Sequence, residues 1–85
     1  MKELNTEIQT QINIAAFFLA QENYTYDKLC WMLAKRRLLT EKDSRYVQED
    51  RTKEKAAEIF FLAPPYDILC WLIAELDILI KFGKM

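Results

Sequence analysis

The hexapeptide Tyr26–Trp31 (YDKLCW) returns forty residues later as Tyr66–Trp71 (YDILCW). Over the fourteen residues that begin at these two tyrosines, seven aligned positions are identical, and several of the others exchange one apolar residue for another. Upstream, Phe17–Ala20 (FFLA) recurs as Phe60–Ala63 at an offset of 43 residues, so the second copy is three residues shorter between its two motifs. The chain is therefore built from two copies of one structural unit.

The composition and the apolar spacing both favour helices. The 85 residues are 52% hydrophobic and 13% aromatic, with one Gly and two Pro, so the residues that build turns and sheets are scarce. Apolar residues recur at helical spacing in four segments, which we interpret as helices. The four expected helices span residues 3–20, 26–39, about 41–63, and from 65 or 66 to about 82.

In each repeat, one short connection separates the two helices. In the first, Thr25 precedes the helix and can accept a hydrogen bond from its free N–H groups. In the second, Pro64 pushes Ala63 out of helical geometry, whereas Pro65 suits a helix start. Such short connections predict two helical hairpins.

We therefore expect an all-α fold, a four-helix bundle built from two tandem helical hairpins with pseudo-twofold symmetry. It forms one domain over residues 1–85, with repeat 1 at about 3–39 and repeat 2 at about 41–82. A chain of this size buries only about 60% of its unfolded surface, so its core must be dense or it must self-associate. Trp31 and Trp71 are expected in equivalent, largely buried sites.

Between the repeats, eleven of the nineteen residues 40–58 are charged. A linker is one interpretation of this segment. The other, which we favour, is that the third helix begins at residue 41, because Thr40 and Asp43 have capping-box spacing and the charges alternate in sign every four residues.

Two interpretations also apply to the Tyr-Asp pair at each turn. Asp27 and Asp67 sit where the positive end of a helix ordinarily favours an acid. Alternatively, the hydroxyls of Tyr26 and Tyr66 form symmetry-related pairs with these carboxylates across the bundle.

The chain lacks the residues that most catalytic sites require. The sequence has no histidine, and its single glycine excludes a phosphate-cradling loop. Cys30 and Cys70 lack CxxC spacing and have apolar neighbours, so we expect reduced, buried, structural thiols. We expect no enzyme, no catalytic or cofactor-binding residue and no metal site.

The net charge and the lengths of the apolar segments indicate the cellular location of the protein. A net charge of −1, with both signs mixed, gives no global attraction to nucleic acid or anionic lipid. No signal-peptide core opens the chain, and no run reaches the roughly 18 apolar residues of a membrane span. We expect a cytoplasmic protein.

The expected fourth helix is apolar over more than half its circumference. A side seam extends its main apolar stripe, and Glu75 falls inside the apolar arc. The seam is either core, with this helix wrapped by the other three, or a surface that a partner covers. The candidate partner-binding residues are Trp71, Glu75, Ile78 and Phe82.

The favoured functional hypothesis is a non-catalytic protein–protein interaction module, a small adaptor, regulator or inhibitor. It binds another protein or itself, as a homodimer, through this apolar flank. The alternative is a small nucleic-acid-binding helical protein that uses the one dense basic cluster. The residues of that cluster are Lys35, Arg36, Arg37, Lys42 and Arg45.

Overall fold

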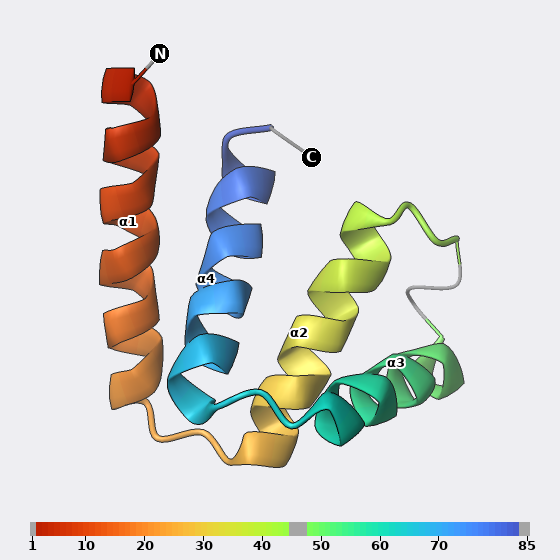
Figure 1. The fold of residues 1–85 in the computed structure, drawn as a ribbon. Helices are drawn as coiled ribbons and strands as arrows, with labels where there is room; N and C mark the ends of the chain where they lie inside the picture. The colour runs from red at the N-terminus through yellow and green to blue at the C-terminus, as the bar shows by residue number, and fades with distance from the viewer. Residues whose placement is uncertain (1, 45–47, 84–85) are drawn as a thin grey trace.

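The structure is a computed structural model that describes residues 2–44 and 48–83. Within these ranges the chain forms four α-helices and no strand (Figure 1). The helices are α1 (Lys2–Gln21), α2 (Tyr26–Thr40), α3 (Glu49–Leu62) and α4 (Tyr66–Lys81). The prediction of an all-α, four-helix fold is confirmed.

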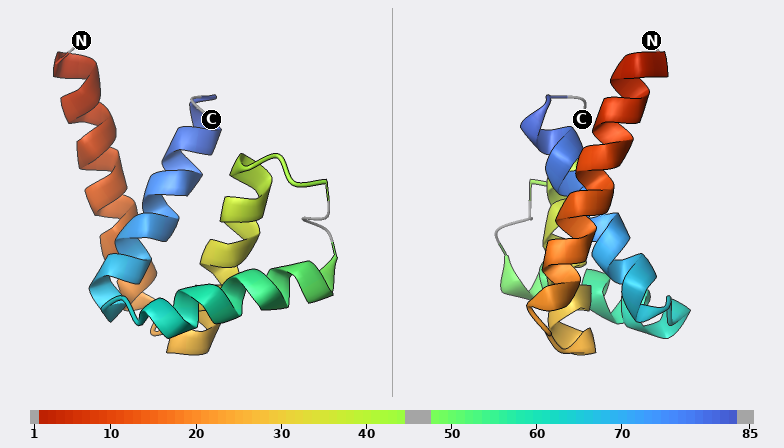
Figure 2. Two further views of the ribbon diagram at one scale, coloured as in Figure 1. Left: turned by 45° about the vertical axis from the view of Figure 1, so that its right-hand side comes forward. Right: turned by 90° about the vertical axis from the view of Figure 1, so that its left-hand side faces the viewer.

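The helices pack in an order that differs from their order along the chain. Helix α1 packs on α4, α4 packs on α2, and α2 packs on α3. Figure 1 shows α4 between α1 and α2, and Figure 2 shows α3 lying across α2. The first helix of each repeat thus packs on the second helix of the other repeat, so the two repeats interlock.

The centre of the core is the contact between the repeated helices α2 and α4, which run side by side in the same direction (Figure 1). Leu29 and Leu33 of α2 meet Leu69 and Ile73 of α4, and all four are at most 1% exposed. Their spacing of four residues puts each pair on one face of its helix. Burying each such side chain contributes about 1.5–3 kcal/mol to folding.

Small side chains at matching positions allow the helices to approach closely. Cys30 and Cys70 are both buried, and so are Ala34 and Ala74. The predicted equivalence of the repeats therefore extends to burial at these central core positions.

The two tryptophans are less buried than predicted. Trp31 and Trp71 are both only partly buried, and they are equivalent in this respect. The deepest positions are instead occupied by the aliphatic residues of the central stripe. A tryptophan is too large for the narrow gap between two closely packed helices, so each lies at the edge of the core.

A reciprocal pair of hydrogen bonds ties the two connections together. The Tyr26 hydroxyl donates to the carbonyl oxygen of Pro64 at 2.5 Å, and the Tyr66 hydroxyl donates to that of Tyr24, also at 2.5 Å. Residues 24 and 64 correspond at the offset of forty, so the two bonds obey the pseudo-twofold symmetry. The tyrosines thus bond across the bundle, but their acceptors are backbone carbonyls and not the carboxylates of Asp27 and Asp67.

The start of α2 and the end of α3 agree with the signals in the sequence. The Lys28 backbone N–H donates to the Thr25 side-chain oxygen at 3.1 Å. Helix α3 ends at Leu62, where Ala63 takes a left-handed conformation with φ of 51° ahead of the two prolines. Both features match the sequence-based prediction.

The predicted helix over 41–63 begins too early, because α3 starts only at Glu49. Lys42 adopts a left-handed φ of 60°, and the N–H of Asp43 returns to the carbonyl oxygen of Leu38 at 3.0 Å. This hydrogen bond closes a Schellman-type end on α2, so the chain turns away before a new helix starts. Thr40 is the last residue of α2 and not the cap of a following helix, and its hydroxyl donates to the carbonyl oxygen of Arg37.

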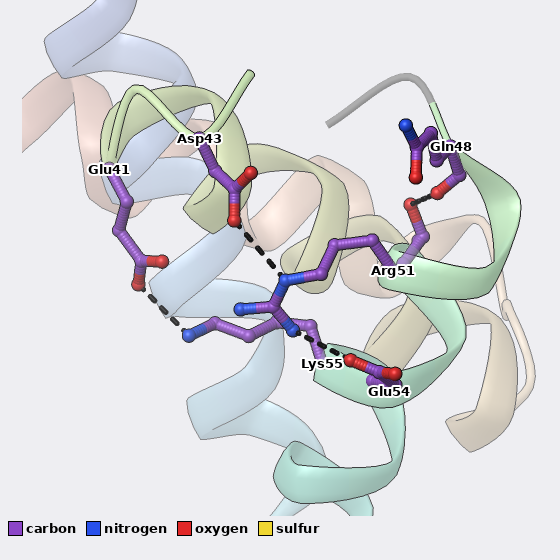
Figure 3. A network of polar contacts seen from close by, with 7 residues as sticks. Glu41, Asp43, Gln48, Arg51, Glu54 and Lys55 are labelled. Carbon is purple, nitrogen blue, oxygen red and sulfur yellow. Dashed lines mark hydrogen bonds and ion pairs between the residues drawn. The ribbon is translucent and has the colours of Figure 1, made fainter. Parts of the chain in front are cut away.

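Ion pairs hold the start of α3 against the turn after α2 (Figure 3). The Arg51 guanidinium lies 3.2 Å from the Asp43 carboxylate and 3.4 Å from that of Glu54. Lys55 pairs with Glu41 at 3.0 Å. Two of these ion pairs, Arg51–Asp43 and Lys55–Glu41, therefore fasten α3 to the turn after α2.

We expect Tyr26→Phe and Tyr66→Phe each to lower the free energy of unfolding by about 1 kcal/mol, the net contribution of one hydrogen bond. Tyr24→Phe is the matched control, because the Tyr24 hydroxyl makes no hydrogen bond to the described residues. Urea denaturation followed by circular dichroism measures all three. Losses at positions 26 and 66 no larger than at position 24 would show that the reciprocal bonds do not stabilise the fold.

Candidate interaction surface

The flank of α4 predicted to bind a partner is covered in part by α1. Ile78 is only 9% exposed and packs in a second buried cluster with Ile12 and Ala74. Trp71 packs against this cluster, and its Nε1 donates to the side-chain oxygen of Asn13 on α1 at 3.1 Å. Of the two interpretations of the flank, core is therefore the one that describes Ile78.

The other two flank residues differ in exposure. Glu75 is partly buried, and Phe82, just beyond the end of α4, is 44% exposed. The four residues do not form one exposed apolar face, because Trp71 and Ile78 pack in the cluster with α1 and Glu75 carries a charge.

The largest exposed apolar side chains come from the other repeated motif, FFLA. Phe17 and Phe18 at the end of α1 are 60% and 62% exposed. Their counterparts at the end of α3, Phe60 and Phe61, are 50% and 85% exposed. Both copies of the motif thus direct two aromatic rings towards solvent.

These aromatic pairs gather at one end of the molecule. The connections 22–25 and 63–65 are joined by the reciprocal tyrosine bonds, so the helix ends beside them lie at the same end of the molecule, with the starts of α4 and α2 between the end of α1 and the end of α3 (Figure 1). Ten large apolar side chains are exposed among residues 6–44 and 48–83, and seven of them lie at this end. We call this surface the aromatic end; it consists of Phe17, Phe18, Phe60, Phe61, Leu62, Tyr66 and Ile68.

Two equivalent grooves adjoin the aromatic end. One lies between α2 and α3 with a volume of about 360 Å³, and the other lies between α4 and α1 with a volume of about 320 Å³. Corresponding residues of the two repeats line both grooves. They are Asp27, Cys30, Trp31 and Phe60 in the first groove, and Asp67, Cys70, Trp71 and Phe17 in the second. The phenylalanine in each groove comes from the other repeat, so the interlocked packing creates both grooves.

The cysteines beneath these grooves are poor nucleophiles. Burial raises the pKa of the Cys30 thiol above its ordinary value, and the Asp27 carboxylate raises it further. Burial and then Asp67 do the same for the pKa of Cys70. Because the thiolate is the reactive form, both side chains act here as small apolar residues, as the sequence predicted.

Some residues of the predicted basic cluster contact the rest of the protein, and others are exposed to solvent. The Arg36 guanidinium pairs with Asp77 on α4 at 2.6 Å and also donates to the carbonyl oxygen of Met32. Arg37 is partly buried, whereas Lys35 and Lys42 are exposed. The fifth member, Arg45, lies outside the described residues.

The sequence carries a signal for the aromatic end in the paired phenylalanines of the FFLA motif. Adjacent residues on a helix point about 100° apart, so two successive phenylalanines cannot both face one narrow core contact. The FFLA motif carries this pair in both copies, which indicates a role that is not confined to packing.

We expect Ile78→Lys and Phe82→Lys to have opposite outcomes. A lysine at the buried position 78 leaves an uncompensated charge in the core and should lower the free energy of unfolding by about 3–5 kcal/mol. A lysine at position 82 should change it by at most about 0.5 kcal/mol, since this side chain already contacts solvent. Circular dichroism and denaturant melts compare the two variants. Retained helix and stability in Ile78→Lys would contradict the packing of α1 on α4.

Among the described residues, no helix is both long and apolar enough to cross a bilayer. No protein-family model, curated protein or solved structure matches the chain, so its fold and surfaces carry the functional argument alone.

Proposed function

We propose that the protein is a non-catalytic interaction module that binds a protein partner through its aromatic end. The observation that carries this proposal is the exposure, on one end of a small domain, of two symmetry-related phenylalanine pairs. The buried thiols and the lack of histidine in the sequence support the non-catalytic part of the proposal.

The amount of exposed aromatic surface supports binding. An aromatic side chain has about 150–250 Å² of surface to bury, so four phenylalanines that are half or more exposed leave on the order of 500 Å² in solvent. The largest apolar patch of a typical monomer is about 300–600 Å² and is often functional. Leu62 and Ile68 enlarge the aromatic end beyond the phenylalanines alone.

The two grooves give the aromatic end pockets that a partner's side chains can enter. Binding energy in interfaces concentrates where aromatic side chains meet well-packed pockets. Trp31 and Trp71 each form one wall of a groove, so the aromatic end offers both projecting rings and cavities for a partner's side chains. Of the predicted α4 flank, Trp71 thus borders this surface, whereas Phe82 lies just past the opposite end of the helix.

Site-specific photocrosslinking in the native host tests the proposal. We expect benzoylphenylalanine at position 18 or 61 to form discrete covalent adducts with protein, since a partner covers these positions. The matched control is position 50, where Asp50 is exposed in the first turn of α3, away from the aromatic end. No adduct at 18 and 61, or the same adducts at 50, would refute an interface at the aromatic end.

A further inference from the structure

We propose that the occupant of the aromatic end is a second copy of this chain, bound end to end as a symmetric dimer. This inference rests on the proposed function, because it names the partner of that same surface. In such a dimer both copies use the same patch, so each aromatic end is buried by the other.

The exposed area matches what a dimer of this kind needs. A stable interface buries about 800 Å² on each partner, and the interfaces of homodimers are about 65% apolar. The apolar part therefore amounts to roughly 500 Å² per copy, which is the amount that the four phenylalanines alone leave in solvent. A second copy brings the same area, so the two surfaces match in size and in chemistry.

The pseudo-twofold symmetry of the chain suits this arrangement. The two phenylalanine pairs lie on either side of the joined connections, one on α1 and one on α3. When two such ends meet, each pair of one copy faces an aromatic pair of the other. All four pairs in the dimer are then buried together, and none is left facing a polar surface.

The charges around the aromatic end make the proposal distinctive. The turns beside the two connections carry the carboxylates of Glu22, Asp27, Glu58 and Asp67 and the ammonium group of Lys28. Lys53 lines the groove beside Phe60 and Phe61, so four carboxylates stand against two ammonium groups. Two copies joined at this end therefore bring like charges near one another. These groups are exposed, so their repulsion is modest and is screened by salt, whereas apolar contact is not weakened by it.

The direction in which association changes with salt concentration therefore distinguishes the candidate occupants. Association of two aromatic ends should strengthen several-fold when NaCl is raised from about 0.05 to 0.5 M, because screening removes the repulsion between like charges. Binding of the acidic aromatic end to a basic surface should weaken instead. The basic Lys35 and Lys42 lie towards the other end of α2, so a head-to-tail chain of copies belongs to this second class.

Sedimentation equilibrium of the purified chain, at several concentrations and at both salt levels, tests the proposal. We expect a monomer–dimer equilibrium that shifts towards dimer at high salt. Phe61→Lys should abolish the dimer and leave circular dichroism and melting of the monomer unchanged, because this ring is 85% exposed. Leu39→Lys, which changes an exposed leucine at the opposite end, should leave the dimer intact.

Four outcomes would overturn the inference: a wild-type monomer at all concentrations, a dimer that survives Phe61→Lys, association that weakens with salt, or association beyond two copies. A wild-type monomer together with adducts to other proteins at positions 18 and 61 would refute the second copy and leave the interaction module standing. Adducts of the chain to itself support both proposals, and the lack of any adduct refutes the proposed function.

Discussion

The contact between α2 and α4 is the interaction on which the rest of the structure depends. Each helix contributes the same stripe of a large residue followed by a small one, with Leu29 and Cys30 matched by Leu69 and Cys70. Because these helices come from different repeats, neither repeat has a complete core without the other. The outer helices α1 and α3 then pack on the remaining faces of this pair.

This arrangement also explains why aromatic surface remains in solvent. An outer helix touches the core along one face only, and α3 buries little beyond Ile59 and Thr52. The adjacent Phe60 and Phe61 remain half or more exposed, as Phe17 and Phe18 do on α1, although Phe60 and Phe17 each line a groove beside the core. A domain of this size gains limited stability from its own core, so burying these rings in an interface would add a stabilising contribution that the monomer lacks.

The sequence predicted those features that local chemistry determines. The helices, the Thr25 cap and the end of α3 at Ala63 follow from apolar spacing, capping residues and prolines. The start of α3 did not follow, because a left-handed Lys42 gives no signal in a segment rich in charge. The burial of Ile78 depends on which helix covers α4, and the spacing of one helix does not reveal its neighbour.

Native-state hydrogen exchange tests most directly the claim that the two repeats share one core. Amides in the middle of α2, near Leu33, and of α4, near Ile73, should exchange only through global unfolding and with the same free energy, because each helix completes the core of the other. Measurement at low protein concentration keeps association from adding to the protection. If one repeat instead opened at a markedly lower free energy while the other stayed protected, the repeats would be independent hairpins, and the account of an interlocked core would be wrong.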